Sequence, residues 1–345
     1  MQFNRRKFLQ CSSLVVSGQL LTACANQINQ SSSDQASSDS LDKVTYGTNW
    51  YAQAEHGGFY QALATGIYQE HNLDVTIKMG GAQVNGTQLL MGKTVDFFMG
   101  YGSDAIKAVE AGIPKITVAA IFQKDPQVLI AHPGVGNDSL EDFRGKPLYI
   151  SVAANSTYWR FLKAKYGYTD EQKRPYNFSI APFLKEEEAV QQGYLSSEPY
   201  QIQKEGEFEP VVILLADHGY TPYSTTIETR KELVENNPDL VQRFVDASIK
   251  GWYSYLENPL PGNELIKKAN PEMTDTQLSY TLEKIKEYGL LLSGDAEKKG
   301  IGAMTEDGWK SFFESMVNVG VFKPETDYKQ AFTLEFVNKG WKAYK

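Results

Sequence analysis

Short apolar runs alternate with segments of helical periodicity, and this alternation constrains the fold more than any other feature of the sequence. Apolar runs at 44–47, 75–77, 95–99 and 116–122 predict strands, and the segments between them carry apolar residues at helical spacing. A repeated strand–helix pattern predicts a mostly parallel sheet with helices on both faces. We therefore expect an α/β fold that binds ligands at the carboxyl ends of its strands.

A second series of elements begins near residue 128. Apolar runs predict three further strands, at 128–131, 148–152 and 211–215. After Thr225 the pattern becomes mainly helical. Helical periodicity predicts helices at 158–166, 237–255, 274–288 and 306–317. Thr305 precedes two acidic residues, which is typical of a helix N-cap.

Composition limits the classes of function. The chain has 345 residues with 41% apolar composition, enough for about two domains. A net charge of −8 argues against non-specific binding of nucleic acids. The cysteines, Cys11 and Cys24, both lie near the N-terminus, so the folded body has no cysteines for a disulfide or a thiolate metal site. The four histidines show no metal-binding spacing, and we expect no metal and no cofactor.

The N-terminal residues predict export. A basic cluster that includes Arg5 and Arg6 precedes a short apolar run at 14–21, which is typical of a secretory signal in residues 1–24 and too short to span a bilayer. The two arginines followed by Lys-Phe-Leu resemble a twin-arginine export signal. Leu-Thr-Ala-Cys, ending at Cys24, resembles the bacterial lipobox, in which the cysteine is acylated and becomes the mature N-terminus. The alternative is an ordinary cleaved signal with an incidental Cys24.

Residues 25–42 predict a tether. They are rich in Ser, Gln and Asp with almost no apolar side chains, so they cannot pack into a core. A flexible tether between an acylated cysteine and a folded body fits a protein anchored at the outer face of a membrane.

An ordered set of motifs covers roughly residues 44–345. Its earlier members are Asn49-Trp50, His56–Ala62, Gly66–Tyr68 and Asn72–Val75. Its later members are Gly92–Asp96, Ala111–Pro114, Asp142–Lys146, Gly193–Tyr200 and Pro238–Val241. The set resembles the sulfonate- and pyrimidine-binding family of periplasmic binding proteins. That family includes binders of nitrate, taurine, thiamin precursors and riboflavin, and it shares a fold with the fungal thiamin pyrimidine synthase.

The resemblance implies a type II-like periplasmic-binding-protein fold with two α/β lobes. The chain is expected to cross between the lobes near 123–126 and 222–227, so that residues 43–123 and 227–345 form the first lobe and residues 124–226 the second. It further implies a monomeric substrate-binding lipoprotein that delivers a small molecule to the permease and ATPase of an ABC importer.

Candidate ligand-binding residues in the first lobe follow the predicted strands. They are Trp50, Tyr51, His56, Gly81, Gln83, Tyr101, Ser103 and Asp104. The rings of Trp50 and Tyr51 suit stacking on a flat heterocycle, or else they pack in the core. His56 is either a hydrogen-bond donor to the ligand or a helix cap. The glycine turns allow close backbone approach, whereas Ser103 and Asp104 also fit plain N-capping.

The second lobe supplies hydroxyl, amide, carboxylate and aromatic candidates. They are Asn155, Ser156, Thr157, Glu198, Tyr200, Tyr220 and Tyr223. Aromatic rings with carboxylates favour a planar N-heterocycle, such as a thiamin pyrimidine precursor or riboflavin. An alkylsulfonate or nitrate is the alternative, but a site for such an anion favours Arg or Lys, which these turns lack.

A synthase is the second alternative, and the sequence argues against it. The synthase relatives carry a lysine and a histidine four residues apart and a cysteine cluster. Alignment through Ala111–Pro114 puts Gly100 and Asp104 at the lysine and histidine positions, and there is no cysteine after Cys24. No nucleophile elbow is present either. We therefore expect a binding protein rather than an enzyme.

Overall fold

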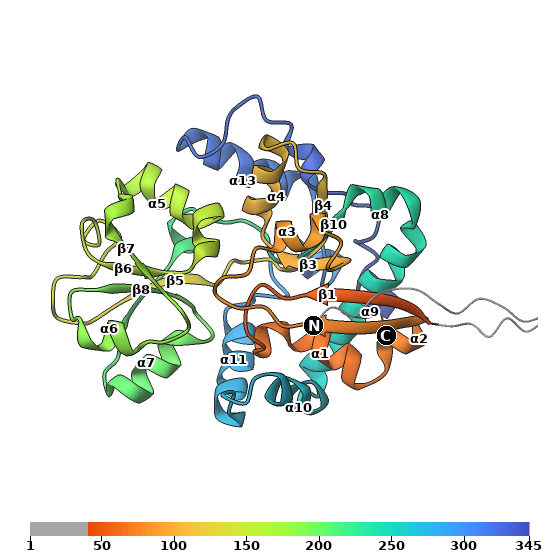
Figure 1. Ribbon diagram of the computed structural model, residues 1–345, viewed down its shortest axis with the longest axis horizontal. Coiled ribbons are helices and arrows are strands. Elements are labelled where there is room, and N and C mark those ends of the chain that lie inside the picture. Colours follow the sequence, from red (N-terminus) through yellow and green to blue (C-terminus); the bar gives the residue numbers. More distant parts are fainter. Residues whose placement is uncertain (1–40, 345) are drawn as a thin grey trace, which may run out of the picture. The chain divides into compact units, whose positions relative to one another are not determined.

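The computed structural model describes residues 41–344, which form two five-stranded mixed sheets flanked by helices (Figure 1). The first sheet has the order β2-β1-β3-β10-β4. Its strands are β1 (Asp42–Gly47), β2 (Leu73–Lys78), β3 (Phe97–Gly100), β4 (Lys115–Phe122) and β10 (Ser224–Arg230). We call this sheet and its helices the first lobe.

The second sheet has the order β7-β6-β8-β5-β9. Its strands are β5 (Gln127–Ala131), β6 (Leu148–Ile150), β7 (Lys173–Pro175), β8 (Val190–Tyr194) and β9 (Val211–Leu214). Helices α5 (Tyr158–Tyr166), α6 (Ala181–Lys185) and α7 (Glu198–Gly206) flank it, and together they form the second lobe (Figure 1).

Four of the five strands in each sheet run in the same direction, as the strand–helix alternation predicts. The fifth strand, β10 or β5, is antiparallel to both of its neighbours. Each antiparallel strand is the first one formed after the chain passes from one sheet to the other. The crossing segments are residues 123–126 and the stretch from η4 (Leu215–His218) to Tyr223.

The other α-helices belong to the two chain segments that form the first sheet, from β1 to β4 and from β10 onward. The α-helices are α1 (Gly57–Ala64), α2 (Ile67–Glu70), α3 (Gly86–Met91), α4 (Gly102–Glu110), α8 (Lys231–Asn236), α9 (Pro238–Glu257), α10 (Leu260–Ala269), α11 (Asp275–Glu287), α12 (Ala296–Lys299) and α13 (Glu306–Asn318). The remaining short helices are η1 (Ala54–His56), η2 (Val152–Ser156), η3 (Asp170–Gln172), η5 (Tyr328–Ala331) and η6 (Trp341–Tyr344). The Thr305 side chain accepts a hydrogen bond from the Gly308 backbone, which confirms the predicted N-cap of α13. None of the helices described between residues 41 and 344 is long and apolar enough to cross a membrane.

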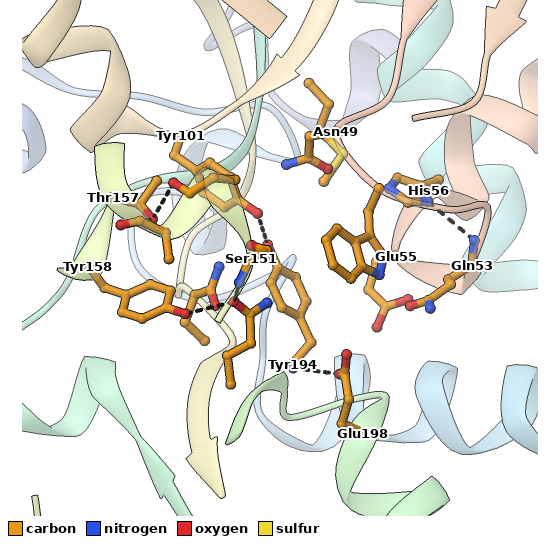
Figure 2. A pocket seen from close by; sticks show the side chains of 16 residues that line it. Asn49, Gln53, Glu55, His56, Tyr101, Ser151, Thr157, Tyr158, Tyr194 and Glu198 are labelled. Atoms are coloured by element: carbon orange, nitrogen blue, oxygen red, sulfur yellow. Dashed lines mark hydrogen bonds between the residues drawn. The ribbon is translucent and has the colours of Figure 1, made fainter. Parts of the chain in front are cut away.

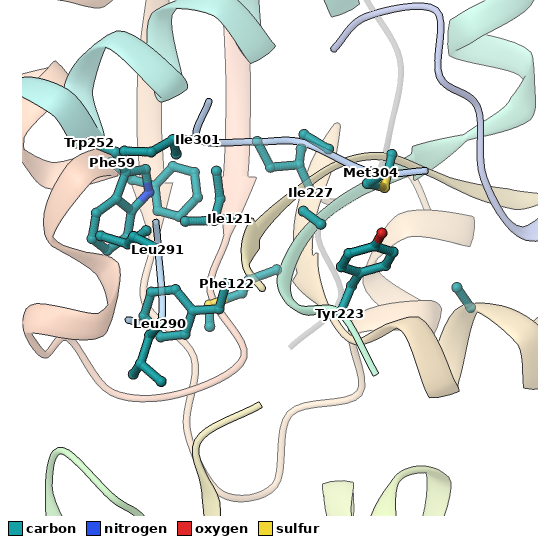
Figure 3. Packing of buried hydrophobic residues seen from close by; sticks show 14 of the residues in the cluster. Phe59, Ile121, Phe122, Tyr223, Ile227, Trp252, Leu290, Leu291, Ile301 and Met304 are labelled. Atoms are coloured by element: carbon teal, nitrogen blue, oxygen red, sulfur yellow. The ribbon is translucent and has the colours of Figure 1, made fainter. Parts of the chain in front are cut away.

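Aromatic and aliphatic side chains together fill the core of the first lobe (Figure 3). Trp252 of α9 meets the rings of Phe59 and Phe122 edge-on, with centroids 5.9 and 5.8 Å away. Gly58 of α1 lies against the indole, and a Cβ there would come within 2.1 Å of Trp252 Cγ. Glycine at this position therefore lets α1 and α9 pack closely.

Strand β10 lies where the sequence predicted mainly helix after Thr225. Its sequence, Ser-Thr-Thr-Ile-Glu-Thr-Arg, has little apolar character, yet every residue is buried. Glu228 is held by Lys115, and Arg230 is paired with Asp96, so long-range partners replace the hydrophobic pattern. Residues 224–226 consequently pair with the first sheet, within the expected crossing but ahead of the predicted lobe boundary at 227.

The predicted signal peptide, the lipobox at Cys24 and the tether up to residue 40 lie outside the described residues. Asp42, the last residue of the predicted tether, is the first residue of β1.

Candidate functional site

A cavity of about 40 Å³ lies between the two sheets, and residues of both lobes line it (Figure 2). Its lining consists of Asn49, Trp50, Gln53, Glu55, His56, Met99, Tyr101, Gln127, Ser151, Ala153, Ala154, Thr157, Tyr158, Gln192, Tyr194 and Glu198. Many of these residues follow strands: Trp50 comes after β1, Tyr101 after β3 and Ser151 after β6. Carboxyl ends of neighbouring parallel strands meet at one sheet edge, which explains why they converge here.

Aromatic rings form the walls of this cavity. Trp50 stacks on Tyr176 of the second lobe with centroids 6.0 Å apart and an interplanar angle of 20°. The hydroxyls of Tyr101 and Tyr194 are 2.6 Å apart, joining the two lobes (Figure 2). Tyr158 donates a hydrogen bond to Gln192 Oε1 at 3.0 Å. The rings are thus fixed by partners at the cavity wall, which suits binding of a flat ligand.

His56 is a neutral hydrogen-bond donor. Its Nδ1 accepts a hydrogen bond from the Gln53 backbone N–H at 3.2 Å (Figure 2). Burial lowers the pKa of the imidazole from 6.5 to about 3. A neutral imidazole that accepts at Nδ1 carries its proton on Nε2, so this side chain offers an N–H group.

Glu55 joins the lobes and also faces the cavity. Its Oε1 accepts a hydrogen bond from Ser196 Oγ in the second lobe at 2.6 Å. Burial is the largest cause that raises its pKa from 4.5 to about 7, with a smaller contribution from the charge of Glu198. Glu55 was absent from the candidates because nothing in its local sequence marks it as a site residue.

Glu198 stands in the first turn of α7 with both carboxylate oxygens engaged. Oε1 accepts a hydrogen bond from the Tyr176 hydroxyl at 2.9 Å, and Oε2 accepts one from the Tyr194 backbone N–H at 2.8 Å. Burial raises the pKa of this carboxyl. Its clearest role in the structure is therefore to hold two aromatic residues in place.

Three polar atoms of cavity-lining side chains have no hydrogen-bond partner among residues 41–344. They are Gln53 Nε2, Glu55 Oε2 and Gln127 Oε1. Leaving a buried polar group unsatisfied costs about 1–3 kcal/mol, so a ligand with matching donors and acceptors gains by pairing with them. No lysine or arginine of the described chain lines this cavity. The arrangement therefore suits a neutral ring with both donors and acceptors better than a bare anion.

The structure brings five sequence-predicted candidates to the cavity: Trp50, His56, Tyr101, Thr157 and Glu198. Asp104 and Asn155 line an adjoining cavity instead. The side chain of Ser156 is not among those described. These placements leave the binding role of each residue a prediction.

Three other first-lobe candidates form a small contact group beside the cavity. Tyr51 packs on Phe178 with ring centroids 4.9 Å apart, and a Cβ on Gly81 would be 3.1 Å from the Tyr51 ring. Gln83 Nε2 donates a hydrogen bond to Asn177 Oδ1 in the second lobe at 3.2 Å. Tyr51, Gly81 and Gln83 do not line the cavity.

The remaining candidates have structural partners away from the cavity. The Tyr220 hydroxyl donates to Ser103 Oγ at 2.8 Å in a buried contact. The Tyr223 hydroxyl donates to Asp295 and accepts from the Thr305 backbone. Tyr200 packs on Tyr280, with centroids 4.9 Å apart.

Several lining residues were missed by sequence reasoning. Asn49, Gln53, Ser151 and Tyr194 lie in or beside loops at strand ends, which was the available signal. The other missed polar or aromatic residues are Glu55, Gln127, Tyr158 and Gln192. Strand glutamines such as Gln127 and Gln192 give no local signal, because their placement depends on how the two sheets face each other.

Solved structures share the fold. A protein from Bordetella bronchiseptica RB50 aligns with a TM-score of 0.65 at 15% identity, covering 85% of this chain and 95% of its own. The alkanesulfonate-binding protein SsuA from Xanthomonas axonopodis pv. citri, bound to MOPS, aligns with a TM-score of 0.60 at 11% identity, covering 85% and 98%. These similarities show the periplasmic-binding-protein fold.

Relatives found by sequence similarity indicate which family of proteins with this fold the chain belongs to. The riboflavin-binding protein RibY of Chloroflexus aurantiacus is 26% identical, covering 87% of each chain. The formylaminopyrimidine-binding protein of Halalkalibacterium halodurans is 24% identical, covering 81% of this chain and 87% of its own. A protein of Legionella pneumophila named 4-amino-5-hydroxymethyl-2-methylpyrimidine phosphate synthase is 22% identical, covering 69% and 77%. The family model described as "NMT1/THI5 like" matches residues 53–260, so the chain belongs to the NMT1/THI5-like family.

Proposed function

We propose that this protein is the extracytoplasmic substrate-binding component of an ABC importer and that it binds a small planar N-heterocycle between its lobes. The observation that carries the proposal is a set of polar atoms on Gln53, Glu55 and Gln127 that have no hydrogen-bond partner in the described part of the chain and that belong to a cavity with aromatic walls. A thiamin pyrimidine precursor or a similar heterocycle offers ring faces for stacking and N–H and N or O atoms at its edge. The names of the riboflavin- and formylaminopyrimidine-binding relatives support this ligand class.

The alternative ligand is an alkylsulfonate or nitrate. A desolvated anion needs several N–H donors or a cation, and carboxylates nearby repel it. The cavity presents Glu55 and Glu198, and no lysine or arginine of the described residues lines it. The sulfonate-binding structural neighbour has 11% identity and supports only the fold.

The proposed mechanism is closure of the two lobes on the ligand. Contacts that cross between the lobes close to the cavity include the hydrogen bonds of Glu55 with Ser196, Tyr101 with Tyr194, and Gln83 with Asn177. Two chain crossings connect the sheets and suit a hinge. A ligand that contacts both walls binds the closed arrangement more tightly and so selects it.

Synthesis of a thiamin pyrimidine is the competing enzymatic function, and the name of the Legionella relative is the reason to consider it. No lysine between residues 41 and 344 lines the first cavity, and the chain has no cysteine after Cys24. Gly100 and Asp104 occupy the two positions where the synthases are expected to carry lysine and histidine. The missing Cβ of Gly100 makes room for Glu228, and Asp104 is paired with Lys115. These residues favour binding over catalysis.

The proposal includes export and anchoring. The protein is expected to reach the outer face of the cytoplasmic membrane by the twin-arginine route that Arg5-Arg6 indicate, and to be held there by a lipid on Cys24. Its partners are then the ligand, the permease and ATPase of the importer, and the membrane itself. We expect it to act as a monomer.

Isothermal titration of the full-length protein tests the ligand class. The panel consists of 4-amino-5-hydroxymethyl-2-methylpyrimidine and riboflavin against taurine and nitrate. Binding of a heterocycle with no heat from either anion supports the proposal. Binding of taurine or nitrate with no heat from either heterocycle contradicts it.

A further inference from the structure

We propose that a second cavity, next to the first, is a subsite for an uncharged, hydroxyl-bearing substituent of the same ligand. The inference rests on the proposed function and extends it, because it assigns chemistry to the part of the ligand outside the ring. The second cavity has a volume of about 460 Å³, against about 40 Å³ for the first. The first cavity alone therefore leaves little room beyond a single ring, since one water needs about 10–15 Å³ on the same measure.

The two cavities lie next to each other. They share five lining residues: Asn49, Met99, Tyr101, Ala153 and Thr157. The second cavity continues from there along the first lobe, between α3 and α4 and over the end of β3. A ring held in the first cavity can therefore extend a substituent past Tyr101.

A buried ion cluster forms part of the wall of the second cavity. Lys115 of β4, which is 1% exposed, donates hydrogen bonds to Asp104 of α4 and to Glu228 Oε2 of β10, the latter at 2.7 Å. The Glu228 carboxyl lies against Gly100, where a Cβ would be 2.2 Å from Glu228 Cδ. Glycine at position 100 thus keeps room for a carboxylate beside the cavity.

One acceptor of this cluster is unused. Glu228 lines the cavity and is 1% exposed, yet its Oε1 has no hydrogen-bond partner within residues 41–344. Asp104, which also lines the cavity, has a side chain that is 24% exposed. The wall therefore includes acidic side chains that can accept hydrogen bonds from the donors of a ligand.

The charged side chains at the second cavity indicate which hydrogen-bond donors of a ligand fit it. Asp104 and Glu228 are acidic, and Lys115 and the cavity-lining Lys107 are basic, so the charges of the four groups sum to zero when all of them are ionised. Burial raises the pKa of the Glu228 carboxyl to about 7, so this balance is reached above that pH. Lys115 is already engaged by the two carboxylates and offers little to an anion. An uncharged substituent with hydroxyl groups satisfies the free acceptor without bringing a charge into a neutral site. Asn85, Thr87 and Gln88 add polar side chains to the lining.

A matched pair of probes tests the subsite with the full-length protein. Riboflavin carries a hydroxylated chain on its ring system, whereas lumiflavin carries a methyl group at the same position. We expect riboflavin to bind at least about tenfold more tightly in fluorescence titrations, which corresponds to about 1.4 kcal/mol. Either flavin requires the lobes to part further than the first cavity shows, and this cost is common to both probes.

Two variants test whether the difference in affinity between riboflavin and lumiflavin arises at the second cavity. Ala111→Trp adds a ring from the exposed rim of the second cavity, and Asp104→Asn removes a charge from its wall. In each variant the ratio of riboflavin to lumiflavin affinity should fall toward about 1. Ala343→Trp and Asp307→Asn are the controls, because both residues are exposed and line neither cavity, and they should keep the wild-type ratio.

The outcomes separate this inference from the proposed function. Equal affinity for the two flavins, or a ratio unchanged in Ala111→Trp, overturns the subsite while heterocycle binding stands. Binding of 4-amino-5-hydroxymethyl-2-methylpyrimidine with neither flavin bound also overturns the subsite and keeps the proposed function. Failure of all three heterocycles to bind overturns both.

Discussion

The Glu55 carboxyl of the first lobe lines the cavity and accepts a hydrogen bond from Ser196 of the second lobe at 2.6 Å, while its other oxygen has no hydrogen-bond partner among the residues that the structure describes. One side chain thus takes part in both the contact between the lobes and the wall of the binding cavity. Because of this shared role, a change at the ligand is expected to alter the closure of the lobes.

Trp50→Ala should weaken binding of a heterocycle by about 1–3 kcal/mol, the scale of aromatic–base stacking. The indole lines the cavity and is only partly buried, so its loss should leave the fold intact. Isothermal titration measures the affinity, and thermal unfolding checks the fold. Trp341→Ala is the control, since Trp341 is 46% exposed and does not line the cavity. Wild-type affinity in Trp50→Ala would mean that the ligand binds elsewhere.

Stability should fall as the pH rises from about 5 to 8. Burial raises the pKa of Glu55 to about 7 and that of Asp125 from 3.8 to about 7. Between the ordinary and raised values, these two carboxyls bind more protons in the folded protein than in the unfolded chain, so the stabilisation that they contribute is fully present at low pH and is lost through pH 7. Glu55→Gln should reduce this slope, by roughly 1–3 kcal/mol over the window. Urea unfolding at several pH values measures it, and an identical slope in Glu55→Gln would contradict the assignment.

Tyr194→Phe should favour the open arrangement, because it removes the hydroxyl that lies 2.6 Å from the Tyr101 hydroxyl across the lobes. We expect a loss of about 0.5–1.5 kcal/mol in ligand affinity, the usual net value of one hydrogen bond. Titration with the same heterocycle gives the affinity, and small-angle scattering reports opening. Tyr166→Phe, outside the cavity, is the matched control and should change neither.

Gly58→Ala should destabilise the first lobe. The new Cβ would lie 2.1 Å from Trp252 Cγ, and a packed core does not yield easily to added volume. Overpacking typically costs about 1–3 kcal/mol, and this close approach belongs at the upper end. Gly112→Ala is the comparison: its surroundings are open, so only the strain of its φ of 67° is added. Urea denaturation should rank Gly58→Ala as the less stable variant, and the reverse order would contradict the packing argument.

Cys24→Ser should release the protein from the membrane fraction if the cysteine is acylated. Fractionation of cells followed by immunoblotting measures the distribution. Arg5→Lys with Arg6→Lys should block export if the twin-arginine route is used. A wild-type protein already free in the soluble exported fraction would contradict the anchor, and unchanged export of the double variant would contradict the route.

Much of the fold could be predicted because the strands at 44–47 and 116–122 are apolar and the helices between them are periodic. Strand β10 could not, since the burial of Glu228 and Arg230 depends on Lys115 and Asp96, more than a hundred residues away. The local hydrophobic pattern of a segment does not show ion pairs with residues so far away in the sequence.

Part of the cavity could be predicted from residues that follow strands. Trp50 comes three residues after the end of β1, Tyr101 comes directly after β3, and both line the cavity. Tyr220 and Tyr223 also follow a strand, yet their hydroxyls pair with Ser103 and Asp295 instead. The packing of the two lobes decides which side chain faces the cavity, and the sequence of a single loop does not show how the lobes pack.

Native mass spectrometry of the full-length protein incubated with equal concentrations of 4-amino-5-hydroxymethyl-2-methylpyrimidine, riboflavin, taurine and nitrate tests the central claim most directly. The account predicts a one-to-one complex with a heterocycle that is lost in Trp50→Ala and retained in Trp341→Ala. A complex with taurine or nitrate in place of the heterocycles would contradict it.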